Sequence, residues 1–167
     1  MIVRVKPKPV GAIAMAIVSA VVSRGVQAEE RRSLLHEGGD ALSRLEIRMA
    51  GLEECLKLLD KIGVGSRELT NALQRGRQNI DKVRHDARQV GIDVDSASSQ
   101  ATVASKLLID ELNRGFNVGN RDSLQDVCNK IGKGAETALR QLIEAMQKLR
   151  EQPPEDHINS KAPEDLK

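Results

Sequence analysis

The feature that most constrains this chain is a set of apolar and small residues that recur at alternating steps of three and four positions. Such steps place side chains on one stripe of an α-helix, and the repeat matches a heptad seam. The sequence therefore predicts an all-α protein. The four stripes are Leu42, Leu45, Met49, Leu52, Leu56 and Leu59; Leu69, Leu73, Gly76, Ile80, Val83, Ala87 and Val90; Ala97, Ala101, Ala104, Leu108 and Leu112; and Leu124, Cys128, Ile131, Ala135, Ala138, Leu142, Ala145 and Leu149.

Residues that start and stop helices divide these stripes. The Gly-Val-Gly sequence at 63–65 breaks the first helix, the Ser66 hydroxyl suits an N-cap, and Gly91 suits a left-handed residue after the second. Asp122 and Gln125 resemble a capping box before the fourth. Because the connections are short, we expect an antiparallel, up-down-up-down four-helix bundle, with an extended pair of helical hairpins as the alternative. The expected helices span residues 30–62, 67–90, 96–114 and 122–151.

Aromatic residues are nearly absent from the sequence. Phe116 is the single Phe among 167 residues, and there is no Trp or Tyr. Aromatic side chains dominate many cores and binding hot spots, so this core is expected to be aliphatic. That composition argues against sandwiches and barrels, while 40% hydrophobic residues suffice for one domain of ordinary size.

The N-terminus has the layout of a signal peptide. Three cations in residues 1–9 precede an uncharged, mostly apolar run at residues 10–22, and a short polar segment at residues 23–28 closes in Val26-Gln27-Ala28. Cleavage after Ala28 is expected. A membrane anchor through residues 10–22 is an alternative, although that run is shorter than the roughly 20 residues that span a bilayer; an organellar presequence and a core helix are further alternatives. The expected division is a signal peptide at 1–28, a helical bundle at 29–151 and a disordered, acidic, Pro-containing tail at 152–167.

The charge of the chain is unevenly distributed. Four of its 26 basic residues and none of its 24 acidic residues lie in residues 1–28. The remainder is therefore slightly acidic, whereas nucleic-acid binding requires a basic field over the folded domain. We expect no nucleic-acid partner.

The two cysteines lie near opposite ends of their helices in sequence. Cys55 lies about seven residues before the end of the first expected helix, and Cys128 about six after the start of the fourth. In an up-down-up-down bundle these positions are at the same end. An oxidising compartment then predicts a Cys55–Cys128 disulfide, with two buried free thiols as the alternative.

Motifs for catalysis, metals or cofactors are incomplete in this sequence. His36 and Glu37 open like the zinc motif H-E-x-x-H, but Asp40 stands at its fifth position. Residues 93–95 open like a calcium loop without its later Gly and Glu, which favours an acidic start of a helix. The glycine pair at 132–134 lacks the residues of a phosphate loop. We therefore expect no enzyme, no cofactor and no metal.

One charged face is a candidate binding site. Arg77, Arg84 and Arg88 share a face of the second expected helix, which predicts a site for an anionic partner. The alternative is a solvated face paired with acids of the first or fourth helix.

The leading functional expectation combines the export signal with the apolar helix faces. It is a non-enzymatic, secreted or periplasmic helical bundle that acts through protein contacts, by self-association or on a partner. An adaptor, a surface or adhesin-like protein and a secretion-apparatus component all fit this description by analogy. The alternatives are a carrier of a lipid or other apolar ligand, and an uncleaved, membrane-tethered coiled-coil protein.

Overall fold

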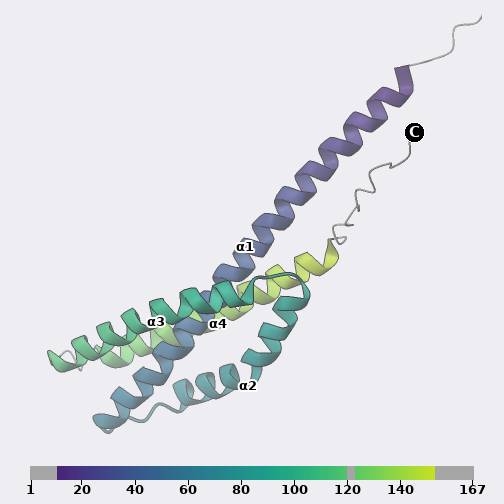
Figure 1. The fold of residues 1–167 in the computed structure, drawn as a ribbon. Coiled ribbons are helices and arrows are strands. Elements are labelled where there is room, and N and C mark those ends of the chain that lie inside the picture. Colours follow the sequence, from purple (N-terminus) through teal and green to yellow (C-terminus); the bar gives the residue numbers. More distant parts are fainter. Residues whose placement is uncertain (1–10, 120–122, 153–167) are drawn as a thin grey trace, which may run out of the picture.

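The computed structural model describes the backbone of residues 11–119 and 123–152, and the side chains of these ranges from Val26 onward. The described residues form four helices and no strand, and consecutive helices run in opposite directions (Figure 1). The all-α, up-down-up-down prediction is confirmed. The helices are α1 (Gly11–Lys61), α2 (Arg67–Gln89), α3 (Val94–Asn117) and α4 (Leu124–Glu151).

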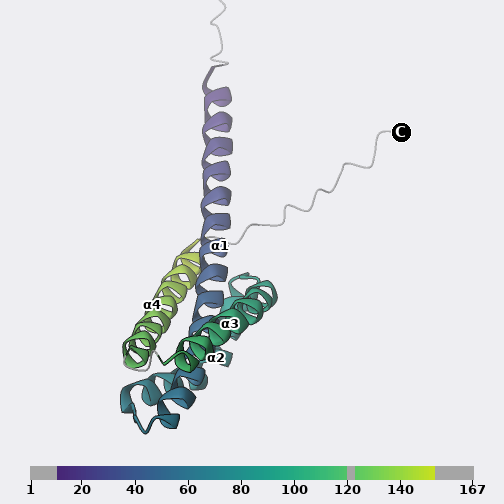
Figure 2. The same cartoon turned by 90° about the vertical axis from the view of Figure 1, so that its left-hand side faces the viewer.

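The start of α1 differs most from its expected position. The heptad stripe predicts a helix from about residue 30, whereas α1 begins at Gly11 and continues without a break to Lys61. Among the side chains that the structure describes, the first buried one is Leu34, and the N-terminal part of the α1 backbone extends beyond the other helices (Figures 1 and 2). A periodic apolar pattern indicates where a helix packs, so it does not mark the start of a helix that extends past its neighbours. The predictions for residues 1–10, for residues 153–167 and for Asp122 concern positions outside the described residues.

The predicted signals at the helix ends are confirmed in the connections. The Ser66 hydroxyl accepts a hydrogen bond from the Leu69 amide at 3.4 Å, which caps the start of α2. Gly63 after α1 and Gly91 after α2 adopt φ angles of 71° and 92°. This left-handed conformation is one that glycine adopts without steric cost, so both helices end where the sequence predicts.

The central position of α1 decides how the other helices pack. It packs extensively against α3 and α4 and less against α2, and Figure 2 shows α3 and α4 on opposite sides of it. From Leu45 to Leu56 no residue of α1 is exposed. All eight members of the α4 stripe are buried, as predicted, and α4 contacts both α1 and α2. The helix order is therefore that of an up-down-up-down bundle, but α1 is a central element rather than one of four equivalent corners.

A glycine on α1 allows its two main neighbours to approach at the same height. A Cβ atom at Gly51 would lie 2.7 Å from Leu108 Cδ2 on α3 and 3.3 Å from Ile131 Cγ2 on α4. Both separations are shorter than ordinary van der Waals contact, so a side chain here would require the Leu108 and Ile131 side chains to shift. The absence of a side chain at Gly51 thus leaves space that Leu108 of α3 and Ile131 of α4 fill.

The predicted Cys55–Cys128 disulfide is present. It joins the C-terminal part of α1 to the N-terminal part of α4, with a Cα–Cα distance of 5.7 Å, and both residues are fully buried. The antiparallel arrangement places the two positions at the same end of the bundle, as the sequence predicts.

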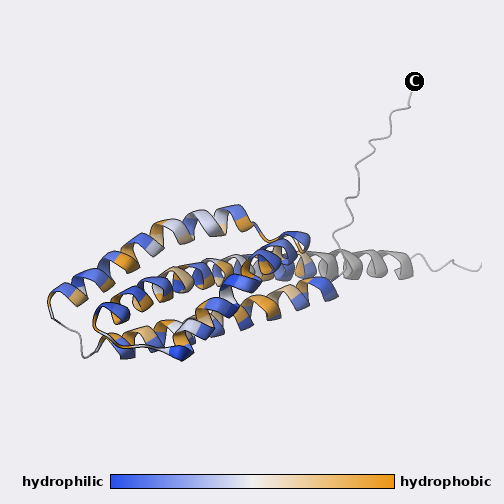
Figure 3. Ribbon diagram, turned by 90° about the horizontal axis from the view of Figure 1, so that it is seen from below, coloured by the Kyte–Doolittle hydropathy of each residue, from blue (hydrophilic) through white to orange (hydrophobic). Residues whose placement is uncertain are grey.

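Each helix carries both hydrophobic and hydrophilic residues along the part that is coloured in Figure 3. Within the described part of the chain, no helix is long and apolar enough to cross a membrane. The core is aliphatic, as expected from the composition; its largest fully buried side chains are Leu42, Leu52, Leu58, Leu59, Leu142 and Leu149.

Candidate functional site: a groove between α3 and α4

A groove separates two helices that share a common support. Both α3 and α4 pack on α1, yet they hardly contact each other. The space between them is a groove of about 410 Å³ with Arg48 of α1 among its lining residues. In a closed four-helix bundle neighbouring helices would fill this space with interdigitating side chains, so the groove is an unfilled packing position.

The walls of the groove are two apolar stripes at helical spacing. Because each step is three or four residues, each stripe lies on one side of its helix. At a rise of 1.5 Å per residue, the stripes are about 12 Å long, or two helical turns. The stripes are Leu108, Leu112 and Phe116 on α3, and Leu124, Val127 and Ile131 on α4.

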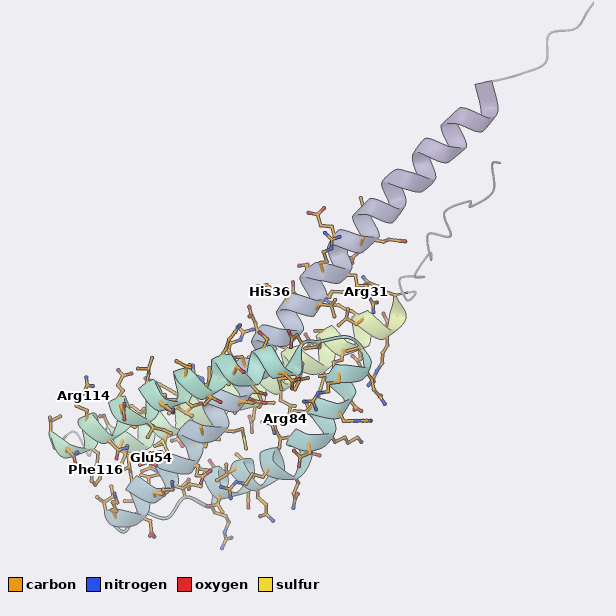
Figure 4. The ribbon with its side chains drawn as sticks, in the orientation of Figure 1. Arg31, His36, Glu54, Arg84, Arg114 and Phe116 are labelled. Carbon is orange, nitrogen blue, oxygen red and sulfur yellow. A yellow bond between two sulfur atoms is a disulfide. The ribbon has the colours of Figure 1, made fainter. Side chains whose placement is uncertain are left out.

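Part of this apolar lining is accessible. Val127 is 38% exposed, and Leu108 and Phe116 are half-buried. Phe116 lies near the end of α3 (Figure 4), where the Lys61 ammonium is 5.9 Å from the centre of its ring. The one aromatic residue of the chain is therefore placed at a groove rather than in the core, and aromatic residues are enriched at binding hot spots.

The charges of the groove are predominantly basic. Arg48 is half-buried at its base and Lys130 is exposed on α4, while Glu111 of α3 is the acid of the lining. Neither base forms an ion pair with a described residue. Gly134 of α4 leaves room for Arg48, because a Cβ atom there would lie 3.1 Å from Arg48 Nε.

Two polar contacts hold α3 on α1. Glu46 Oε1 accepts a hydrogen bond from Ser98 Oγ at 3.0 Å, and Glu54 Oε1 accepts one from Asn113 Nδ2 at 3.0 Å. The two acceptors are two turns apart on α1, so they fix both the register and the direction of α3. Together they hold α3 on the central helix without help from α4.

The predicted arginine face is paired with acids of the same chain. Each of the three side chains forms a short ion pair, and Arg77 and Arg88 remain more than half exposed. The structure thus shows the paired arrangement that the sequence left open, with acids from α1 and α3 rather than from α1 or α4. The pairs are Arg77–Glu53 at 2.7 Å, Arg84–Glu46 at 2.8 Å and Arg88–Asp95 at 2.7 Å. An anionic partner for this face stays a prediction.

Replacement of Glu46 by Gln is expected to lower the free energy of unfolding by about 2 kcal/mol. The Glu46 side chain is 10% exposed and accepts hydrogen bonds from both Arg84 and Ser98. Gln keeps the shape but removes the charge that strengthens these bonds. The matched control is Glu136→Gln, because Glu136 is 67% exposed and pairs with Arg75 at 3.9 Å. It should change stability by less than about 0.5 kcal/mol. Urea unfolding followed by circular dichroism measures both, and equal effects would contradict the prediction.

A second groove of about 370 Å³ lies between α2 and α4. Leu45 and Met49 of α1 line it together with Leu139 and Ile143 of α4. Gly76 of α2 leaves room for Met49, whose terminal atoms lie where a Cβ atom would be. This groove is apolar, with charged residues at Arg75, Glu136, Arg140 and Glu144.

The incomplete motifs find ordinary structural roles. The exposed His36 ring lies 3.6 Å from Asp40, and Asp93 Oδ1 accepts a hydrogen bond from the Ser96 amide, which makes it the N-cap of α3. Residues 93–95 therefore form the acidic start of a helix and not a calcium loop. Among the described residues no group of three or more metal-ligating side chains comes together.

Comparison of the chain with protein-family models, with curated proteins and with solved structures finds no match. Its function is therefore argued from the groove and the rest of its geometry alone.

Proposed function

We propose that this protein is a non-enzymatic, extracytoplasmic helical bundle that binds an amphipathic helix of a partner protein in the α3–α4 groove. The observation that carries the proposal is the separation of α3 from α4 above a common central helix, which leaves about 410 Å³ between two apolar stripes. A helix that enters this position would complete the layer around α1.

The dimensions of the groove suit helix recognition. Helices that bind in grooves do so through apolar residues at steps of three and four, which pack between matching stripes of the receptor. Phe116 and Val127 lie on facing walls and are accessible, so they are the natural anchors for such a contact. Two turns of helix match the length of the walls.

The extracytoplasmic location is supported by two independent features. The N-terminal sequence has the layout of a signal peptide, and the Cys55–Cys128 disulfide is consistent with an oxidising compartment. Cleavage after Ala28 would also spare the bundle. No described side chain before Leu34 is buried, and the Arg31 guanidinium, which donates to the Leu149 carbonyl at 3.3 Å, lies after the cleavage position.

The location is tested by the intact mass of the protein from a secretion-competent host, with and without reduction before alkylation. The expected mass begins at Glu29, with both thiols protected until reduction. A mass that begins at Met1 or Ile2 with two alkylated thiols would reject export and would favour a membrane-tethered or intracellular protein.

Binding in the groove is tested by a photo-reactive amino acid at position 127, in the same host. A discrete adduct is expected from this position and none from position 82, an exposed site on α2. The adduct should disappear when Leu108→Glu places a charge on the opposite wall. An adduct of twice the chain mass would show that the groove binds a second copy of this chain instead of a partner protein. Adducts of equal yield from positions 127 and 82 would contradict the proposal.

The α2–α4 groove favours a second candidate function, which is carriage of a small apolar ligand. Met49 and Leu139 give it an apolar interior, as ligand pockets usually have. Mass spectrometry of an organic extract of the purified protein tests this candidate. A stoichiometric apolar compound would support it, and an empty extract from protein purified out of its native host would count against it.

A further inference from the structure

We propose that the helix bound in the α3–α4 groove carries carboxylates beside its apolar stripe, and that Arg48, assisted by Lys130, recognises them. This inference rests on the proposed function and names the chemistry of the partner. It makes the groove selective for acidic amphipathic helices rather than for helices in general.

Arg48 forms no ion pair with the residues that the structure describes. Its side chain is half-buried on the central helix, where the low local dielectric makes an unpaired charge more costly than in water. Arg77 and Arg84 are each paired with an acid of α1 at 2.8 Å or less. Arg48 has no such partner in the part of the chain that the structure describes.

The nearby acids of α1 bind side chains other than Arg48. Glu46 binds Arg84 and Ser98, and Glu53 binds Arg77. The positions one turn away from Arg48 on its own helix are 44, 45, 51 and 52, and none of them is acidic. No rotation of the Arg48 side chain along α1 therefore reaches an acid one turn away.

The part of α4 beside the Arg48 guanidinium provides space and a second positive charge. On α4, Gly134 lies beside the guanidinium, because a Cβ atom there would lie 3.1 Å from Arg48 Nε, so this position provides space and no carboxylate. Lys130, one turn earlier on α4, adds a second positive charge on the same side of the groove. An occupant with acids on its α4-facing flank would pair with both, and the planar guanidinium can bind a carboxylate through two parallel hydrogen bonds.

The shape of the groove favours a helix over a fatty acid, which shares the combination of carboxylate and apolar chain. Lipid carriers enclose most of their ligand. This groove instead runs along the surface between two helices, and the walls Leu108 and Val127 are both accessible. A fatty acid is therefore treated as an outcome of the test.

The test uses the oxidised chain that begins at Glu29 and a displayed library of helical peptides. Every peptide has Leu at steps of three and four, and the flanking positions are randomised. We expect peptides selected on the wild-type protein to be enriched in Asp and Glu on one flank, and those selected on Arg48→Glu to be enriched in Lys and Arg. Labelled acidic peptides should bind Arg48→Gln at least tenfold more weakly than wild type.

The control variant is Arg114→Gln. Arg114 is an exposed residue of α3 outside the groove lining (Figure 4), so its loss should change peptide affinity by less than twofold. Circular dichroism shows whether each variant is folded. If Arg48→Glu does not fold, the affinity of Arg48→Gln for the labelled acidic peptides still tests the proposal. A dansylated undecanoic acid is measured in parallel.

The outcomes separate the two proposals. Peptides that bind in the groove, and are lost on Leu108→Glu, but show no acidic enrichment would overturn the role of Arg48 and leave the helix-binding function intact. A library that yields no binder sensitive to Leu108→Glu would overturn both. If the fatty acid binds more tightly than any peptide, and Arg48→Gln weakens that binding, the ligand of the groove is a lipid and not an acidic helix.

Discussion

Reduction of the Cys55–Cys128 bond is expected to lower the free energy of unfolding by about 4 kcal/mol. The bond joins residues 73 positions apart, so it removes a large amount of conformational freedom from the unfolded chain. Both cysteines are fully buried among packed helices whose other apolar contacts do not involve the sulfur–sulfur bond. The native contacts should therefore survive reduction while the unfolded state becomes more favourable. Urea unfolding followed by far-ultraviolet circular dichroism, with and without reductant, measures the difference.

The control for this prediction is the double variant Cys55→Ala with Cys128→Ala. It should be destabilised in the absence of reductant and should not respond to its addition. Since the chain has no Trp or Tyr, fluorescence is a poor probe of unfolding and helicity is the better signal. Equal stability of the oxidised and reduced wild-type protein would show that the bond does not constrain the unfolded chain.

Replacement of Leu52 by Ala is expected to destabilise the protein by about 3–5 kcal/mol. Leu52 has no exposed surface, and its Cδ2 atom packs close to Gly132 of α4. The surrounding helices are held by the disulfide and by their own packing, so they can close around the vacated volume only in part. The cost therefore combines lost apolar burial with a residual cavity.

Leu107→Ala is the matched control because the same side chain is removed from a position that is 67% exposed. Its effect on stability should be within about 0.5 kcal/mol. A similar loss for the two variants would mean that Leu52 is not in a tightly packed core. A large effect of Leu107→Ala alone would mean that α3 is covered in solution by something beyond this chain.

Several parts of the fold follow from local sequence alone. The α4 stripe from Leu124 to Leu149 is buried at every predicted position, because a helix repeats its orientation every three to four residues regardless of its neighbours. Ser66, Gly63 and Gly91 mark helix ends through their own hydroxyl group or their own φ angle. The disulfide required two further assumptions, which are the antiparallel order that short connections favour and an oxidising compartment.

The groove could not be predicted from the periodicity. A stripe states which face of a helix is apolar, but it does not state which other helix covers that face. Leu108 and Leu112 belong to the predicted α3 stripe and Ile131 to the α4 stripe, yet the two stripes meet across a gap instead of packing together. In the sequence, Phe116 stands out only as a solitary aromatic residue, and this rarity is the one signal that points to the site.

The sequence by itself determined the apolar faces of the four helices and the helix ends marked by Gly63, Ser66 and Gly91, because each depends on local spacing or on one residue. Given the helix order and an oxidising compartment, it also determined the pairing of Cys55 with Cys128. The tertiary structure alone decided that α1 is central and that α3 and α4 are held apart. It also decided that Arg77 and Arg84 form ion pairs with acids of α1, whereas Arg48 forms none with the residues that the structure describes. Pairing between helices depends on their relative rotation and separation. Those quantities are set by the packing of all four helices together, at positions such as Gly51, and not by any one helix.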